Sequence, residues 1–229
     1  MALTLYQHPL ASFCHKVLIA LYENATPFRS VTVDFADPAE AAAHLMRWPV
    51  GKIPVLHDDA DDRTIPETSI IIEYVQAHYP GPAPMLPEAA EARLDVRLWD
   101  RFFDLYVSVP MQKIVGDRLR PEGGKDPLGV AEARATLDTA YGMIEAELAG
   151  RSWAAGEDFS LADCSAAPAL FFSTIVHPAG PEKQILTGYF ERLLERPSFK
   201  RVLAEARPYF RLFPYRDAMP ARYLADQSF

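Results

Sequence analysis

The residue types that could do chemistry in this chain are concentrated between Val50 and Val75. A proline that follows Lys52 and Ile53 cannot donate to a sheet, so Pro54 must stand at the start or edge of a strand, where its bond to Ile53 can be cis. Ile53 can then offer its backbone N–H and C=O to an extended peptide lying alongside. The sequence therefore predicts a peptide-backbone contact at Ile53.

A second group able to bind a ligand follows at Glu67 and Thr68, where a helix is predicted to open from Ile65 to Val75. The first N–H groups of a helix lack partners within the helix and suit a carboxylate. With Ile53 opposite, the segment predicts a site for a small acidic peptide. In the simpler interpretation, Glu67 and Thr68 only stabilise the first helical turn, where acids and hydroxyls are common.

The order and spacing of these residues resemble the glutathione-binding half of the cytosolic glutathione transferases of bacterial type. The resemblance rests on Ile53-Pro54, then Glu67-Thr68-Ser69-Ile70-Ile71-Ile72-Glu73-Tyr74, and later Phe159-Ser160-Leu161-Ala162-Asp163 and Arg196-Pro197-Ser198-Phe199. It extends to about residue 206 and leaves out the tail, residues 207–229. It implies that the glutathione-binding residues are Ile53, Pro54, Glu67, Thr68 and Lys52. Lys52 and His44 could reach the glycyl carboxylate of glutathione, or they could be plain surface residues.

Glutathione attacks an electrophile as its thiolate, and with a thiol pKa of ~8.5 only about 3% is ionised at neutral pH. Lowering that pKa by ~2 units is within reach of a hydroxyl hydrogen bond and a helix N-terminus. Ser12, predicted to cap the first helix, could supply both and is the predicted catalytic residue; otherwise it is only a cap. Aligned on Lys16-Val17, the family's usual catalytic Ser or Cys falls on Ala11. Either Ser12 has taken the role, or the activating group is missing.

Cys14 is an alternative nucleophile, for glutathione-dependent thiol–disulfide exchange, although a packed cysteine is the commoner case. Tyr6 ends the first predicted strand, where some transferases carry a tyrosine near the thiol; such a residue more often faces a core. Metal binding is not expected, because His8, Cys14 and His15 lack a metal-ligand spacing. The acidic run at 58–62 lacks the pattern of a calcium loop and is predicted to be a solvated turn.

The elements that must position these residues are predicted as βαβαββα over residues 1–80. A first strand precedes a helix from Ser12, and a second strand holds the alternating Val31-Thr32-Val33. A short helix begins at Asp37-Pro38, and the hairpin around the acidic run leads into the last helix. Strands alternating with helices predict a parallel pair, which the hairpin completes as a mixed sheet. The resemblance identifies this α/β unit as thioredoxin-like.

A linker rich in proline and glycine is predicted at residues 81–87, and the remainder, 88–229, is predicted to be an all-helical bundle. Its first helix is predicted from Glu88 to Val115, and later helices at 130–148, 160–175, 184–194 and 198–206. Ser160 and Asp163 are spaced as a capping box that starts one of them. The apolar face of the first helix carries Leu94, Leu98, Phe102, Leu105 and Val109.

Four aromatic residues on the first bundle helix could line a pocket for an apolar co-substrate, or belong to the core or a subunit interface. They are Trp99, Phe102, Phe103 and Tyr106. The resemblance implies a homodimer, with the long helices after Pro87 and Val130 as the interface.

Composition limits the class of partner. A net charge of −8 argues against nucleic acid or an anionic membrane as the main partner. Two cysteines, no signal peptide and no apolar run of membrane length predict a cytoplasmic protein. The prediction is a homodimeric glutathione transferase that uses glutathione as co-substrate, needs no metal and conjugates a small apolar electrophile. The alternatives are a non-catalytic glutathione- or ligand-binding protein, which Ala11 would allow, and the oxidoreductase that uses Cys14.

Overall fold

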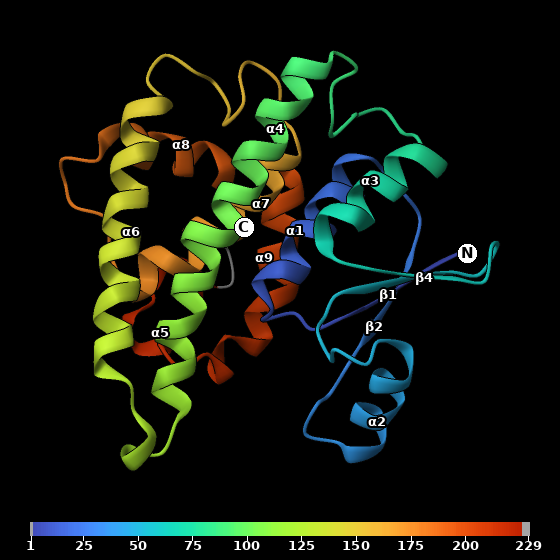
Figure 1. Ribbon diagram of the computed structural model, residues 1–229, viewed down its shortest axis with the longest axis horizontal. Helices are drawn as coiled ribbons and strands as arrows, with labels where there is room; N and C mark the ends of the chain where they lie inside the picture. Colours follow the sequence, from blue (N-terminus) through green and yellow to red (C-terminus); the bar gives the residue numbers. More distant parts are fainter. Residues whose placement is uncertain (1, 226–229) are drawn as a thin grey trace.

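A computed structural model describes residues 2–225 and shows a mixed sheet with its helices beside an all-helical bundle (Figure 1). The predicted fold class, a thioredoxin-like α/β unit followed by an all-α bundle, is confirmed. The exact domain limits, 1–80, 81–87 and 88–229, stay predictions. No helix within the described range is long and apolar enough to cross a membrane.

Four short strands form the sheet in the order β2-β1-β3-β4. They are β1 (Leu3–Gln7), β2 (Arg29–Thr32), β3 (Val55–Asp58) and β4 (Arg63–Pro66). The β1–β2 pair is parallel, whereas β1–β3 and β3–β4 are antiparallel. Leu56 stands between Leu5 and Ile65 in this register, and all three side chains are buried. The predicted mixed sheet is therefore present.

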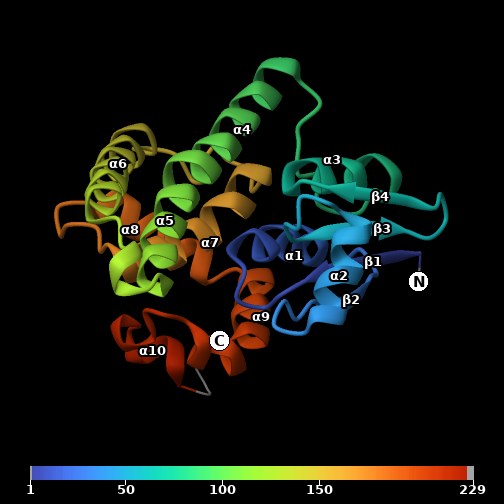
Figure 2. The ribbon, with the colours of Figure 1, turned by 60° about the horizontal axis from the view of Figure 1, so that its bottom comes forward.

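Three helices accompany the sheet: α1 (Ser12–Glu23), α2 (Pro38–Arg47) and α3 (Thr68–His78). The Asp37 carboxylate caps α2 by accepting from the N–H groups of Ala39 and Glu40, with Pro38 at the first helical position as predicted. Helix α1 packs against α3 on one side and against the bundle on the other (Figure 2). It therefore connects the two halves of the molecule.

Two details of the predicted hairpin and helix were wrong. Ile65 and Pro66 belong to β4, and α3 begins only at Thr68, because Ile65 pairs with Leu56 and buries its side chain in the sheet core. Asp58, predicted to lie in a solvated turn, is fully buried. Its carboxylate accepts hydrogen bonds from the hydroxyls of Tyr74 (2.9 Å) and Tyr79 (2.5 Å). Burial alone would raise the pKa of Asp58, but these hydrogen bonds and one from a backbone N–H outweigh it and lower the pKa.

The bundle begins with one long helical rod in three parts. They are α4 (Ala90–Phe102), a π-helical turn (Phe103–Ser108) and α5 (Val109–Leu119). Of the five residues on the predicted apolar face of this rod, only Phe102 is buried, and the other four are exposed. The face packed against the bundle instead carries Val96, Trp99, Phe103 and Val107.

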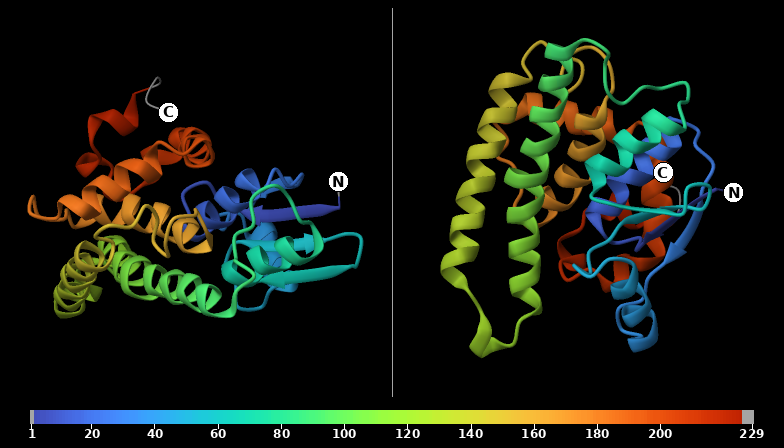
Figure 3. Two further views of the ribbon diagram at one scale, coloured as in Figure 1. Left: turned by 90° about the horizontal axis from the view of Figure 1, so that it is seen from above. Right: turned by 45° about the vertical axis from the view of Figure 1, so that its right-hand side comes forward.

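The remaining helices complete the bundle and its tail. They are α6 (Pro127–Glu147), α7 (Leu161–Val176), α8 (Gln184–Leu194), α9 (Pro197–Ala206) and the four-residue α10 (Ala221–Leu224), with 3₁₀ turns at Glu122–Gly124, Arg207–Leu212 and Arg216–Ala218. Helices α5 and α6 lie side by side and form the long hairpin at one edge of the bundle (Figure 3). The capping box of α7 is present, since the Asp163 carboxylate accepts from the Ser160 N–H at 2.9 Å.

The tail after α9 packs back onto α7, which is the most buried helix of the bundle. The Phe171 ring contacts Phe210 and Tyr223, with centroids 5.9 and 4.9 Å away, and the Phe172 ring lies 5.3 Å from Phe213. Figure 2 shows this segment below the bundle, beside the start of α1. The described part of the tail, residues 207–225, is therefore packed into the folded core, a role that the sequence left open.

Candidate active site

The loop between β1 and α1 places the first helical N–H groups, and side chains of the loop and of α1 hold it in shape. The Ala11 N–H donates to the His8 carbonyl at 2.9 Å, and the Leu10 N–H donates to His8 Nδ1 at 3.2 Å. His15, fully buried, contacts the Pro9 carbonyl through Nε2 at 2.5 Å. Burial lowers the pKa of His15 to about 4, so the ring is neutral at pH 7 and Nε2–H is the donor.

Ser12 is not the predicted cap of α1. Ala11 is the N-cap and Ser12 the first helical residue, since the helix begins one position earlier than a Ser12 cap requires. The Ser12 side chain is only 4% exposed. Within residues 2–225, the N–H groups of Ser12 and Phe13 find no acceptor. The positive end of the α1 dipole is thus available to an anion at Ala11.

Cys14 has the surroundings of a packed residue. Its side chain is fully buried, and burial raises the pKa of the thiol to about 12, although a hydrogen bond donated by the His8 backbone opposes this. A thiol that stays protonated at neutral pH is a poor nucleophile. The geometry therefore argues against thiol–disulfide exchange at Cys14.

A cleft of about 570 Å³, called here the polar cleft, lies between the sheet unit and the rod. All five predicted glutathione-binding residues line it: Lys52, Ile53, Pro54, Glu67 and Thr68. The Ile53–Pro54 bond is cis. The other lining residues are Ala11, Phe13, Phe35, Trp48, Gly51, Arg101, Asp104, Leu105, Val109 and Gln112.

His44 does not take either role suggested by the sequence, because it is fully buried. Its Nε2 lies 3.0 Å from the Lys52 carbonyl oxygen, and its ring meets the edge of Phe35 at 5.5 Å. The side chain of Lys52 is exposed beside the cleft. His44 therefore supports the loop that presents Lys52 and has no access to a ligand in the cleft.

Three polar residues of the opposite wall were missed by the sequence analysis: Arg101, Asp104 and Gln112. The Arg101 guanidinium lies 3.3 Å from the Asp104 carboxylate. Arg101 and Asp104 flank the start of the π-helical turn, which has no clear sequence signature, and this turn decides which side chains of the rod face the cleft.

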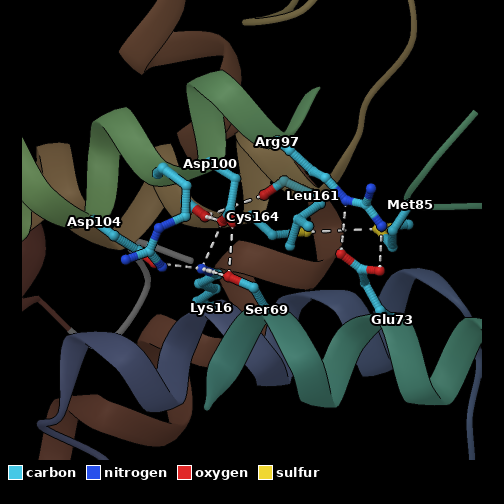
Figure 4. Close-up of polar contacts among 11 residues, drawn as sticks. Lys16, Ser69, Glu73, Met85, Arg97, Asp100, Asp104, Leu161 and Cys164 are labelled. Atoms are coloured by element: carbon cyan, nitrogen blue, oxygen red, sulfur yellow. Dashed lines mark hydrogen bonds and ion pairs between the residues drawn. The ribbon is translucent and has the colours of Figure 1, made fainter. Parts of the chain in front are cut away.

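A buried network of charges lies directly behind the polar cleft (Figure 4). Lys16 Nζ is 2.6 Å from the Asp100 carboxylate and 2.8 Å from the Asp104 carboxylate, and all three side chains are buried. Lys16 also donates to the Ser69 hydroxyl at 3.0 Å, and Ser69 donates to Asp100 at 2.7 Å. The Ser165 hydroxyl donates to Asp100 from α7 at 2.5 Å.

This network joins α1, α3, the rod and α7 at the residue that follows Thr68. Burial raises the pKa of Asp104 and the neighbouring Asp100 adds to this, while Lys16 and Arg101 oppose it. Lys16 supplies one positive charge for two carboxylates, and the half-exposed Arg101 supplies a second one beside Asp104. The start of α3 is therefore fixed to the bundle by buried charges.

A smaller cleft of about 260 Å³, called here the apolar cleft, lies on the other side of Ala11. Among residues 2–225, no charged residue lines it, and a Cβ added at Gly116 would meet nothing within 4 Å. Ala11 and Gln112 line both clefts, so the two are adjacent. The lining residues are Leu10, Ala11, Ser12, Met111, Gln112, Val115, Gly116, Phe172, Phe213 and Pro214.

The remaining aromatic candidates lie away from these two clefts. Trp99, Phe102 and Phe103 are buried in the bundle, and Tyr106 is half-exposed. Trp99 and Phe102 also border a separate surface cleft between α4 and α6. Tyr6 is partly buried beneath the guanidinium of Arg47, 4.1 Å from its ring centroid. Among the described residues, there is no group of three or more side chains that could hold a metal ion.

Comparison with known proteins gives consistent matches along most of the chain. The family model for the N-terminal domain of glutathione S-transferases matches residues 5–83, and that for the C-terminal domain matches residues 127–210. The chain is 24% identical over 204 residues to glutathione S-transferase GstB of Escherichia coli K12, covering 88% of this chain and 97% of that protein. It is 29% identical over 210 residues to the stringent starvation protein A homolog of Coxiella burnetii, covering 89% and 92%.

Among solved structures, a glutathione S-transferase from Methylobacillus flagellatus with glutathione bound superimposes with a TM-score of 0.78. The two sequences are 26% identical, and the match covers 87% of this chain and 98% of that one.

Proposed function

The chain belongs to the glutathione S-transferase family, and we propose that it is an active transferase that joins the glutathione thiolate to a small, neutral, apolar electrophile. The observation that supports this most directly is the meeting of two unlike clefts at the N-terminus of α1. One cleft has charged groups and backbone polar groups, and the other is apolar. A conjugating enzyme needs both sites side by side.

Glutathione occupies the polar cleft in this proposal. It carries two carboxylates and one ammonium group, and the cleft offers the cations Lys52 and Arg101 as well as the acids Glu67 and Asp104. Ile53 contacts the peptide backbone, Glu67 and Thr68 hold the γ-glutamyl end, and Lys52 pairs with the glycyl carboxylate. The cleft thus offers a cation for each carboxylate of the ligand and at least one acid for its ammonium group.

The sulfur of glutathione then lies at Ala11, where the free N–H groups of α1 and the Ser12 hydroxyl favour the thiolate. The thiol gives its proton to solvent. The sulfur lone pair forms the new carbon–sulfur bond, and the leaving group departs with the electron pair of the bond that breaks. The apolar cleft holds the electrophile, and its described lining, which carries no charge, favours an uncharged one.

A homodimer with a cytoplasmic location is part of the proposal. The rod exposes an apolar stripe to solvent, namely Leu94, Leu98, Leu105, Tyr106 and Val109. A large exposed apolar patch is typical of a protein–protein interface. Both cysteines are unpaired and buried, in keeping with a reducing compartment.

A second candidate is a glutathione-binding protein without transferase activity, because Ala11 offers no hydroxyl or thiol at the family's usual catalytic position. Titrating the purified protein with glutathione, while following thiolate absorbance in the ultraviolet across pH, separates the two. We expect saturable binding and a thiol pKa well below its free value of ~8.5. Binding with an unshifted pKa would support the carrier, and no binding would overturn both proposals. Ser12→Ala should lower the conjugation rate with binding kept, and Cys14→Ser should leave it unchanged.

A further inference from the structure

Gln112 occupies a position in the site that its chemistry makes useful. It lies on α5, and it shares with Ala11 the property of lining both clefts. The rod residues on one side of it, Leu105 and Val109, line the polar cleft, and Val115 and Gly116 on the other side line the apolar cleft. Gln112 is therefore the point of the rod that faces the boundary between the two.

This boundary is where the reacting sulfur must lie if glutathione fills one cleft and the electrophile the other. Ala11 contributes only a methyl group from the α1 side. Ser12 lines the apolar cleft alone and is nearly buried. The side-chain donor that faces the boundary from the opposite wall is the Gln112 amide.

The Gln112 amide is also available to bind a ligand. The residue is exposed, and no hydrogen bond within residues 2–225 engages its side chain. Its neighbours along this face of α5, Val109 and Gly116, offer it no side-chain acceptor. A glutamine Nε2 carries two N–H groups, and a donor that meets an anion forms a stronger hydrogen bond than one that meets a neutral group.

We propose that Gln112 is a further catalytic residue, whose Nε2–H donates a hydrogen bond to the glutathione thiolate from the α5 side. It supplies the side-chain donor that Ala11 lacks, while the N–H groups of α1 approach the sulfur from the other side. The inference rests on the proposed function, because it requires a sulfur at this boundary. It assigns a role to the rod in activating the thiol as well as in enclosing the substrates.

The test compares the wild-type protein with Gln112→Met, which keeps the length of the side chain and removes the donor. The thiol pKa of bound glutathione is read from thiolate absorbance across pH, and affinity is measured with S-methylglutathione, which has no ionisable thiol. We expect Gln112→Met to raise the thiol pKa by about one unit, equivalent to about tenfold less thiolate below that pKa. S-methylglutathione should bind within about twofold of wild type.

Two further variants sharpen the result. Gln112→Glu adds a negative charge at the same place, so its thiol pKa should exceed that of Gln112→Met. Lys113→Met, one residue along and outside both clefts, should leave the thiol pKa at the wild-type value. The rate of conjugation to a chlorodinitrobenzene at neutral pH should follow the thiolate fraction across the series.

The outcomes separate this inference from the proposed function. A wild-type protein that lowers the thiol pKa, with Gln112→Met lowering it equally, would overturn the role of Gln112 alone. A variant that changes only the KM of the electrophile would also overturn it, since the amide would then contact the other substrate. A wild-type protein that binds glutathione without shifting the thiol pKa would overturn the proposed function, and this inference with it.

Discussion

The polar cleft and the apolar cleft lie next to each other but are built in different ways. Most of the polar cleft comes from one unit of the fold, with a cis Ile53–Pro54 bond, the start of α3 and a buried charge network behind it. The apolar cleft collects residues from the β1–α1 loop, α5, α7 and the tail. Under the proposed function, the ligand shared across the family is held by local backbone geometry and charge. The variable electrophile is held by side chains brought together from distant segments.

The largest expected effect concerns the charge network behind the polar cleft. Lys16→Met removes the buried cation from Asp100 and Asp104 and leaves Asp100 without a charged partner. Breaking a buried ion pair in this way typically costs about 3–5 kcal/mol, so the free energy of unfolding should fall by about that amount. Denaturant unfolding measures it. Arg97→Met removes an exposed ion pair between the rod and Glu73 of α3, and it should lower the free energy of unfolding by under about 1 kcal/mol. Equal losses in both variants would show that the buried charge network contributes no more to stability than the exposed pair.

The next effect concerns His15. Its Nε2 contacts the Pro9 carbonyl in the loop before α1, and its ring lies 5.5 Å from that of Phe172, which lines the apolar cleft. Its pKa is about 4 when folded and 6.5 when unfolded, so between these values the unfolded chain binds the proton more readily. Stability should therefore be full above pH 6.5 and fall as the pH drops towards 4. At about 1.4 kcal/mol per pKa unit, the loss is on the order of 3 kcal/mol.

Unfolding of wild type and His15→Gln, measured at several pH values, tests this. The variant has no imidazole at this position, so its stability should fall less between pH 6.5 and 4. Parallel curves for the two proteins would assign the acid sensitivity to other groups.

Glu67→Gln probes the polar cleft alone. Glutamine keeps the length of the side chain. Because Glu67 has a positive φ of 69°, a substitution of similar shape also avoids introducing a new backbone preference at this position. Losing a charged hydrogen bond costs about 1.5–3 kcal/mol, which would weaken glutathione binding about tenfold to a hundredfold. Calorimetry gives the affinity, and the KM of the electrophile should stay constant. Glu73→Gln, farther along α3 and outside the cleft, is the matched control; unchanged affinity in Glu67→Gln would mean that the γ-glutamyl contact is misplaced.

The smallest effect concerns the mouth of the apolar cleft. Gly116→Leu places a side chain where the structure leaves open space, so the KM of the electrophile should rise several-fold while glutathione affinity holds. Replacing a glycine within a helix also adds up to about 1 kcal/mol of stability, so lost activity could not be due to unfolding. Gly142→Ala in α6 gives a similar increase in helix stability away from the site and should leave the KM of the electrophile unchanged. If KM did not move in Gly116→Leu, the electrophile would bind elsewhere.

The difference between the clefts also explains how much of the site could be predicted. The predicted residues Ile53 and Glu67 belong to one hairpin-and-helix segment, so their order and spacing carry the information that brings them together. Asp58 in the same segment was placed wrongly, because its burial depends on hydroxyls from Tyr74 and Tyr79 that the local pattern does not reveal.

The rod shows why the opposite wall could not be predicted. The π-helical turn changes the direction in which later side chains face, and a count of apolar residues at ordinary helical spacing misses this. The nearest local signal is Pro110, which cannot donate a backbone hydrogen bond to the preceding turn. Arg101, Asp104 and Gln112 became visible as site residues only once the rod was packed against the sheet unit.

The tail has an evolutionary consequence. The family model for the C-terminal domain ends at residue 210, and Phe213 and Pro214, which form part of the apolar cleft, come after it. None of the described tail residues, 207–225, lines the polar cleft. Mutations in this segment alter the electrophile wall and leave every lining residue of the other cleft in place. Under the proposed function, substrate preference can therefore diverge among relatives by drift in a short terminal segment, while selection preserves the glutathione site unchanged.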